Sequence, residues 1–110
     1  MTDHIDYHAA SHQDKLRRLR ILQRLGQVSP NPMGELAMLD SVMTDPELNP
    51  DIERVRKSFK YLEKHGLVEL IAVDGTDWLA AKITFYGERW LDAPGDFKLA
   101  VYSPGELPET

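Results

Sequence analysis

The sequence predicts one α+β domain in which three helices precede a β-hairpin and a fourth helix, in the order α-α-α-β-β-α. Three observations support this prediction. Apolar residues recur at helical spacing in the first half of the chain, two short apolar runs follow Gly66, and Asp74-Gly75 between those runs is a strong hairpin signal. A chain of 110 residues is long enough for one core and too short for two.

The first expected helix runs from about His12 to Leu25 and ends at Gly26. Its apolar positions are Leu16, Leu19, Ile21, Leu22 and Leu25. They cover more than half of the helix circumference, which leaves a narrow basic stripe. This stripe consists of Arg17, Arg20 and Arg24. Because one core cannot use so wide an arc, we expect part of it to meet a second subunit in a homodimer.

After the turn Ser29-Pro30-Asn31-Pro32, a second helix is expected from about Met33 to Met43. Its inward positions are predicted to be Leu36, Leu39, Val42 and Met43. The third helix is predicted to begin with Asn49 as N-cap and Pro50 at its first position, and to end at Gly66. Its apolar stripe is Ile52, Val55, Phe59 and Leu62. Phe59 lies in the middle of the stripe, so we expect it to be central to the core.

The two strands are predicted at Leu67–Val73 and Trp78–Thr84, with Thr84 capping a helix that ends near Leu91. The aromatic residues of this region are expected to pack into the core rather than line a ligand pocket. They are Trp78, Phe85, Tyr86 and Trp90. We therefore expect a folded domain at residues 12–92 between a frayed segment at 1–11 and an irregular tail at 93–110, where Phe97–Tyr102 is a candidate strand.

The composition excludes several classes of protein. There is no cysteine, so disulfides, thiolate metal sites and cysteine nucleophiles are ruled out. The amino terminus lacks the basic and apolar regions of a secretory signal, and no apolar run approaches the ~20 residues of a membrane span. We therefore expect a cytoplasmic protein. No nucleophile and base share a motif, and no glycine-rich phosphate loop is present, so neither an enzyme nor a cofactor is expected.

The basic residues are concentrated, although the net charge is −5. Ten of the thirteen lie in Lys15–Arg24 and Arg54–Lys64, whereas residues 26–53 contain six acids and no base. Salt screens charges beyond roughly 8 to 10 Å, so a local basic face can engage phosphates despite an acidic remainder.

The third helix and the hairpin carry a family resemblance. Leu62–Glu69 (LEKHGLVE) and Ile83–Leu91 (ITFYGERWL) are similar to the "LEKxGLV … LTxxGxxxL" pattern of winged-helix regulators of the ArsR and MarR kind. Leu19–Leu25, Val55–Val68 and Trp78–Thr84 resemble the small winged-helix proteins of Mu-like phages and prophages. The resemblance implies a winged helix-turn-helix in a DNA-binding transcriptional regulator.

In this interpretation the outward face of the third helix contacts duplex DNA. The expected DNA-binding residues are Arg54, Lys57, Lys60, Tyr61 and Lys64. The first helix would add phosphate contacts through Arg17, Arg20 and Arg24, for which a solvated face is the plainer interpretation. A solvated face, balanced by neighbouring acids, is also the plain alternative for the third helix.

Two acidic sites favour a different class of function. Asp51 and Glu53 begin the third helix, and Asp74 and Asp77 lie at the hairpin turn, where DNA-binding wings tend to be basic. The alternative is therefore a winged-helix module that binds another protein and not DNA.

Three histidines, His4, His8 and His12, are spaced by four residues and would share one helical face. We favour a polar terminal segment over a metal site there, because the segment is terminal and no cysteine is present.

Overall fold

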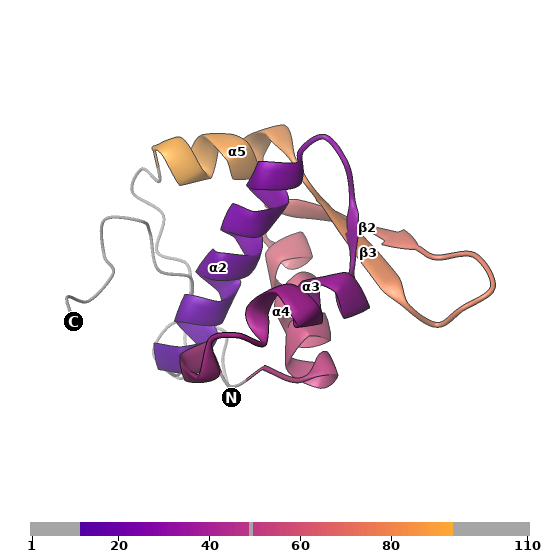
Figure 1. Cartoon of the computed structure of the whole chain (residues 1–110). Coiled ribbons are helices and arrows are strands. Elements are labelled where there is room, and N and C mark those ends of the chain that lie inside the picture. Colours follow the sequence, from indigo (N-terminus) through magenta and orange to yellow (C-terminus); the bar gives the residue numbers. More distant parts are fainter. Residues whose placement is uncertain (1–11, 49, 94–110) are drawn as a thin grey trace, which may run out of the picture.

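The computed structural model describes residues 12–48 and 50–93, which form an α+β fold with an antiparallel three-stranded sheet. The elements are α2 (His12–Val28), β1 (Met33–Gly34), α3 (Glu35–Val42), the 3-10 turn η1 (Pro46–Leu48), α4 (Ile52–Lys64), β2 (Val68–Ala72), β3 (Leu79–Ile83) and α5 (Phe85–Asp92). Figure 1 shows the helices gathered together and the β2–β3 hairpin reaching out beyond them. The predicted α+β class is confirmed.

The core lies where α2, α4 and the sheet meet. From α2 it takes Leu16, Leu19, Ile21, Leu22 and Leu25, all buried. The predicted stripe of α4 is confirmed, because Val55, Phe59 and Leu62 are fully buried and Ile52 is half-buried. Burial of each such side chain contributes about 1.5–3 kcal/mol. Since the wide apolar arc of α2 is buried within the chain, it does not require a second subunit.

The sheet has the strand order β1-β3-β2. In the hairpin, Val68 lies opposite Ile83 and Ala72 lies opposite Leu79, and on the other side of β3 Met33 lies opposite Ala81. The short strand β1 was not predicted, and the expected start of the second helix at Met33 is wrong. Pairing with β3, more than forty residues later in the chain, keeps Met33 and Gly34 extended, so α3 begins only at Glu35.

The buried face of α3 also differs from the prediction. Glu35, Met38 and Val42 are buried, whereas Leu36 and Met43, which were expected to point inward, are exposed. The helix packs the side that carries Glu35 against α4 because Arg56 and a backbone N–H of β3 satisfy that carboxylate there. A polar side chain with partners therefore takes the place expected for Leu36.

Two helix ends need correction. Gly26 does not end α2, which continues to Val28. It is a site of close approach instead, because a Cβ at Gly26 would lie 3.3 Å from Leu91 Cδ1 of α5. The N-cap of α4 is Asp51 and not Asn49, and its carboxylate accepts a hydrogen bond of 2.8 Å from the Arg54 N–H. An acid there also suits the positive end of the helix dipole.

Two other terminal predictions are confirmed. Gly66 ends the α4 segment with φ +78°, a conformation that favours glycine. Thr84 caps α5, since its hydroxyl accepts a 2.9 Å hydrogen bond from the Gly87 N–H.

Each hairpin strand is one residue shorter at the loop than predicted. β2 ends at Ala72 and β3 begins at Leu79, so the loop comprises residues 73–78. Thr76 stabilises it, because its hydroxyl donates to the Val73 carbonyl (2.9 Å) and accepts from the Trp78 N–H (3.1 Å). Gly75 adopts φ +76° within this loop. Thr76 thus closes the loop with two hydrogen bonds.

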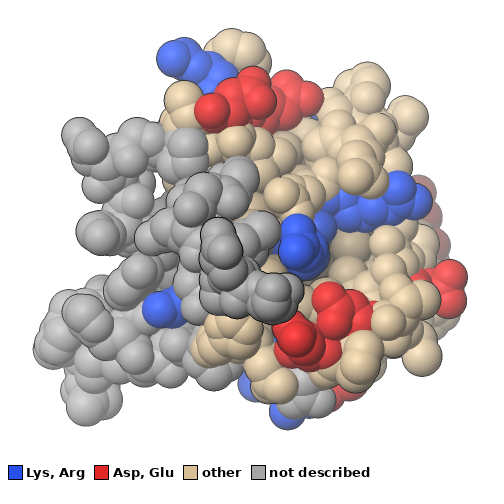
Figure 2. Space-filling view, turned by 60° about the vertical axis from the view of Figure 1, so that its left-hand side comes forward, with Lys and Arg blue, Asp and Glu red and all other residues tan. Residues whose placement is uncertain are grey.

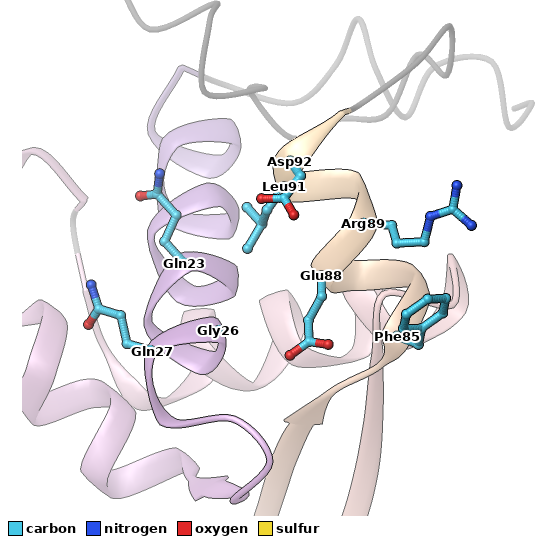
Figure 3. Close-up of a pocket in the computed structure, with 8 residues that line it drawn as sticks. All are labelled: Gln23, Gly26, Gln27, Phe85, Glu88, Arg89, Leu91 and Asp92. Atoms are coloured by element: carbon cyan, nitrogen blue, oxygen red, sulfur yellow. The ribbon is translucent and has the colours of Figure 1, made fainter.

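Of the four aromatic residues assigned to the core, only Trp90 is buried. Trp78 is 46% exposed, Phe85 is 73% exposed, and Tyr86 is also exposed. The prediction was wrong for Phe85 because it is the first residue of α5 and its side chain points away from α2 (Figure 3). It was wrong for Trp78 because this residue alternates with Leu79, which packs against the core.

Several predictions fall outside the described residues. These concern the segment 1–11 with His4 and His8, the Asn49 side chain, and the tail with its candidate strand Phe97–Tyr102. Within the described residues, no helix has the length and apolar character needed to cross a membrane.

Candidate nucleic-acid interface

The outward face of α4 is mainly basic, although the acid Glu53 is exposed there as well. Arg54, Lys57, Lys60 and Lys64 are exposed on the side of the helix that lies away from the buried stripe. The local sequence explains this arrangement, because apolar residues recur at three- and four-residue intervals and the basic residues occupy positions between them. The structure therefore brings four of the five residues predicted to bind DNA onto one surface, which we call the α4 basic face.

The members of this face differ in how much of their charge is available. Arg54 forms an exposed ion pair with Asp51, the residue that caps the helix. The pKa of Asp51 lies below its ordinary value, mainly because its carboxylate accepts the Arg54 N–H, so it stays negative at neutral pH. In contrast, neither Lys57 nor Lys60 forms an ion pair with any residue of 12–48 or 50–93. These two lysines are the best placed to meet a phosphate.

Tyr61, the fifth predicted residue, is half-buried and packs against the core. The guanidinium of Arg18 lies over its ring, 3.9 Å from the centroid, and the His65 ring centroid is 4.5 Å away. These contacts hold the ring between α2 and the end of α4. Tyr61 thus lies at the margin of the α4 basic face and helps to fix the position of the helix.

The predicted arginine stripe of α2 does not exist as a unit. Arg17 is buried, and its Nε donates to the Leu48 carbonyl oxygen at 2.9 Å while it pairs with Asp14 at 2.9 Å. It therefore ties α2 to η1 and is not available to a phosphate. Its burial gave no sequence signal, because the acceptor is a backbone carbonyl far along the chain.

Arg20 and Arg24 remain at the surface, where each donates a 2.9 Å hydrogen bond to a glutamine one turn later. They line a cavity of about 310 Å³ together with residues of α3 and η1 and none of α4. Figure 2 turns the left-hand side of Figure 1 forward and shows basic and acidic side chains interspersed on that face. Arg20 and Arg24 therefore do not extend the α4 basic face.

Sequence reasoning missed a buried ion pair beside this face. The fully buried carboxylate of Glu35 accepts hydrogen bonds from Arg56 Nε (2.8 Å) and Nη2 (2.9 Å), and from the Leu79 N–H (3.0 Å). The hydrogen bonds from Arg56 hold the pKa of Glu35 below its ordinary value of 4.5, against the opposing effect of burial. Glu35 thus joins α3, α4 and β3, and fixes α4 relative to the hairpin. The only sequence signal for its burial was its spacing, because Glu35 lies three residues before Met38 and seven before Val42, on the same side of α3.

The hairpin does not continue the positive surface. Residues 68–83 contain three acids, Glu69, Asp74 and Asp77, and one base, Lys82. All three acids are exposed, and Asp77 lies close enough to Arg56 to help raise the pKa of its guanidinium, after the larger effect of Glu35. The basic helix is therefore bordered by an acidic hairpin tip.

A groove of about 520 Å³ lies between α2 and α5 (Figure 3). Glu88 and Leu91 point toward α2, while Arg89 and Phe85 point away from it, and the two glutamines of α2 point away from α5. The Ser29 hydroxyl donates a 2.6 Å hydrogen bond to the Glu88 carboxylate. Small-molecule sites bring polar groups together at one point, which this groove does not do.

Among the described residues, no group of three or more His, Asp or Glu side chains is placed to hold a metal ion. Comparison of the chain with known protein families, with curated proteins and with solved structures finds no match. The α4 basic face and its surroundings are the part of the described residues that bears most directly on function.

Proposed function

We propose that this protein is a winged helix-turn-helix that binds duplex DNA through α4, as a small cytoplasmic transcriptional regulator of phage or prophage type. The observation that carries the proposal is the α4 basic face, where Lys57 and Lys60 are exposed beside Arg54 and Lys64. A single α-helix fits the major groove of DNA. Lysines that form no ion pair within residues 12–48 and 50–93 can neutralise phosphates, which releases counterions from the DNA.

The surroundings of α4 support this role. Phe59 anchors the helix in the core, and Arg56 attaches its outer flank to Glu35. Such attachment favours binding because little freedom of the helix is lost when a ligand is bound. The order of three helices and a hairpin also agrees with the order expected of a winged helix.

A second candidate is a protein-binding module without DNA binding. The acidic hairpin tip favours it, because Asp74 and Asp77 would repel a phosphate backbone that reached the hairpin. The homodimer remains a prediction, no longer supported by the apolar arc of α2.

Fluorescence anisotropy with a labelled random-sequence duplex, measured over a series of salt concentrations, tests DNA binding. Each phosphate contact contributes about −0.9 to the slope of log affinity against log salt concentration. The double variant Lys57→Gln/Lys60→Gln should therefore bind more weakly and flatten the slope by roughly two units.

The matched control is Arg20→Gln/Arg24→Gln, which removes the same charge from a face that excludes α4. Its slope should remain close to that of the unmodified chain. Equal flattening by the two double variants would mean that overall charge and not the α4 basic face governs binding. No salt-dependent binding at all would favour the protein-binding candidate.

A further inference from the structure

The β2–β3 hairpin exposes an apolar surface that the proposed DNA-binding role does not use. Ile71 and Val73 are each 37% exposed and Trp78 is 46% exposed. Large apolar side chains are normal on a surface when scattered, whereas a contiguous group commonly marks an interaction site. Whether these three are contiguous depends on the register of the hairpin.

The register places all three on one side of the sheet. Ile71 lies opposite Ala80, and the Val73 N–H donates to the Trp78 carbonyl oxygen at 3.1 Å, which continues the same pairing by two residues. Since alternate residues share a face, Ile71 and Val73 lie beside Trp78 and Ala80. The opposite side of the hairpin carries Val68, Ala81 and Ile83 into the core. We call the exposed group of Ile71, Val73 and Trp78 the hairpin outer face.

The charges next to this face are acidic. Asp74 follows Val73 and Asp77 precedes Trp78, while Glu69 lies two residues before Ile71 on the same side, opposite Lys82. Arg56 lies close enough to balance part of the Asp77 charge. Even so, an apolar surface next to two aspartates disfavours nucleic acid and anionic lipid, both of which carry phosphates. It also disfavours symmetric pairing with a second copy, because the same acids would then face each other.

The hairpin outer face is held in place before any partner arrives. Thr76 makes two hydrogen bonds that close the loop, and the Leu79 N–H at the start of β3 donates to the buried Glu35. A rigid apolar surface with a tryptophan loses little entropy on binding, and tryptophan is among the residues that most often dominate binding energy.

We propose that the hairpin outer face docks a cationic amphipathic segment of another protein, in which apolar side chains cover Trp78 and Lys or Arg side chains meet Asp74 and Asp77. This docking is independent of DNA binding by α4. A regulator built this way would hold DNA with its helix and a basic protein partner with its hairpin. The acidic hairpin tip, which would repel DNA phosphates, then serves the hairpin outer face by attracting the basic partner.

A random peptide library displayed on phage, selected on the immobilised full-length chain with counter-selection on the Trp78→Ser variant, tests the proposal. We expect the recovered peptides to be enriched in both Lys or Arg and large apolar residues. Trp78→Ser should weaken their binding by about tenfold or more, as expected of a buried tryptophan anchor. Asp74→Asn/Asp77→Asn should weaken it less, and mainly at low salt.

Phe85→Ser is the matched control, because it removes an exposed aromatic side chain outside the hairpin, and it should leave peptide binding unchanged. Recovery of no Trp78-dependent peptide, or of acidic peptides, would overturn the proposal, as would equal weakening by Phe85→Ser. A concentration-dependent increase in mass that Trp78→Ser abolishes would assign the face to a second copy instead. Loss of DNA binding in Trp78→Ser would assign it to the DNA interface.

The Lys57→Gln/Lys60→Gln variant separates the two proposals. It should retain peptide binding while losing affinity for the duplex. If this variant also lost peptide binding, the proposal for the hairpin would be wrong. If the unmodified chain bound peptides but not DNA, only the proposed function would be contradicted.

Discussion

Glu35 offers the sharpest test of how the α4 basic face is built. Its carboxylate accepts two hydrogen bonds from Arg56 and one from the Leu79 N–H inside the protein. In Glu35→Ala the Leu79 N–H loses its acceptor, which costs about 1–3 kcal/mol for a buried group. The side chain of Arg56 is 36% exposed and can be solvated by water when Glu35 is removed. Breaking this ion pair therefore adds less than the roughly 3–5 kcal/mol that breaking a fully buried pair costs. We expect a total of about 2–4 kcal/mol.

Glu35→Gln separates charge from shape. Its amide oxygen can still accept from the Leu79 N–H and from Arg56 Nη2, but the NH2 group in place of Oε2 cannot accept from Arg56 Nε. One charge-assisted bond is lost and the other is weakened, so we expect a loss of about 1–2 kcal/mol. The exposed Glu63→Gln on α4 is the control and should change stability by less than about 0.5 kcal/mol. Urea unfolding near neutral pH measures all three variants.

The pH dependence gives an independent check. Because the folded-state pKa of Glu35 lies below its ordinary value of 4.5, ionised Glu35 stabilises the fold above that pH. This stabilisation is lost as pH falls through the lower, folded-state pKa. The difference in stability between the unmodified chain and Glu35→Gln should therefore shrink on acidification. A difference that stays constant with pH, or a Glu63→Gln variant as unstable as Glu35→Gln, would contradict a stabilising role of the Glu35 charge.

Two further predictions concern α4 itself. Phe59→Ala should cost about 3–5 kcal/mol because it empties a fully buried site, whereas Lys57→Ala on the exposed side should cost less than about 0.5 kcal/mol. Urea unfolding compares the two, and the reverse order would mean that the helix is rotated and its basic face misassigned. Asp51→Asn should keep the N-cap and remove the negative charge beside Arg54, so the thermal midpoint should change little and the affinity for random duplex should rise. A weaker affinity with an unchanged midpoint would contradict a DNA contact at this end of α4.

Glu35 also relates the two proposed surfaces. It contacts Arg56 of α4 and the first residue of β3, so the basic helix and the hairpin share one buried support. Variants of Glu35 are therefore expected to weaken both DNA and peptide binding, while the surface variants separate them.

Features of this protein that depend on neighbours within a few residues could be predicted from the sequence. The apolar stripe of α4 follows from the three- and four-residue spacing of Val55, Phe59 and Leu62. The left-handed end at Gly66 and the Thr84 cap are equally local, since each depends on one residue's own geometry or side chain. The exposed lysines were predictable for the same reason, because a helix that buries one side exposes the other.

Features whose partners lie far along the chain could not be predicted, because they depend on contacts that only the folded chain makes. Glu35 is buried in place of Leu36 because Arg56 and Leu79 lie opposite it, and Arg17 is buried because the Leu48 carbonyl accepts its guanidinium. Met33 is extended because β3 pairs with it. The Leu48 carbonyl lies 31 residues from Arg17, and Arg56 lies 21 residues from Glu35. In each case the distant partner outweighs the preference set by neighbouring residues. Spacing along the chain gives no information about such partners until the fold brings them together.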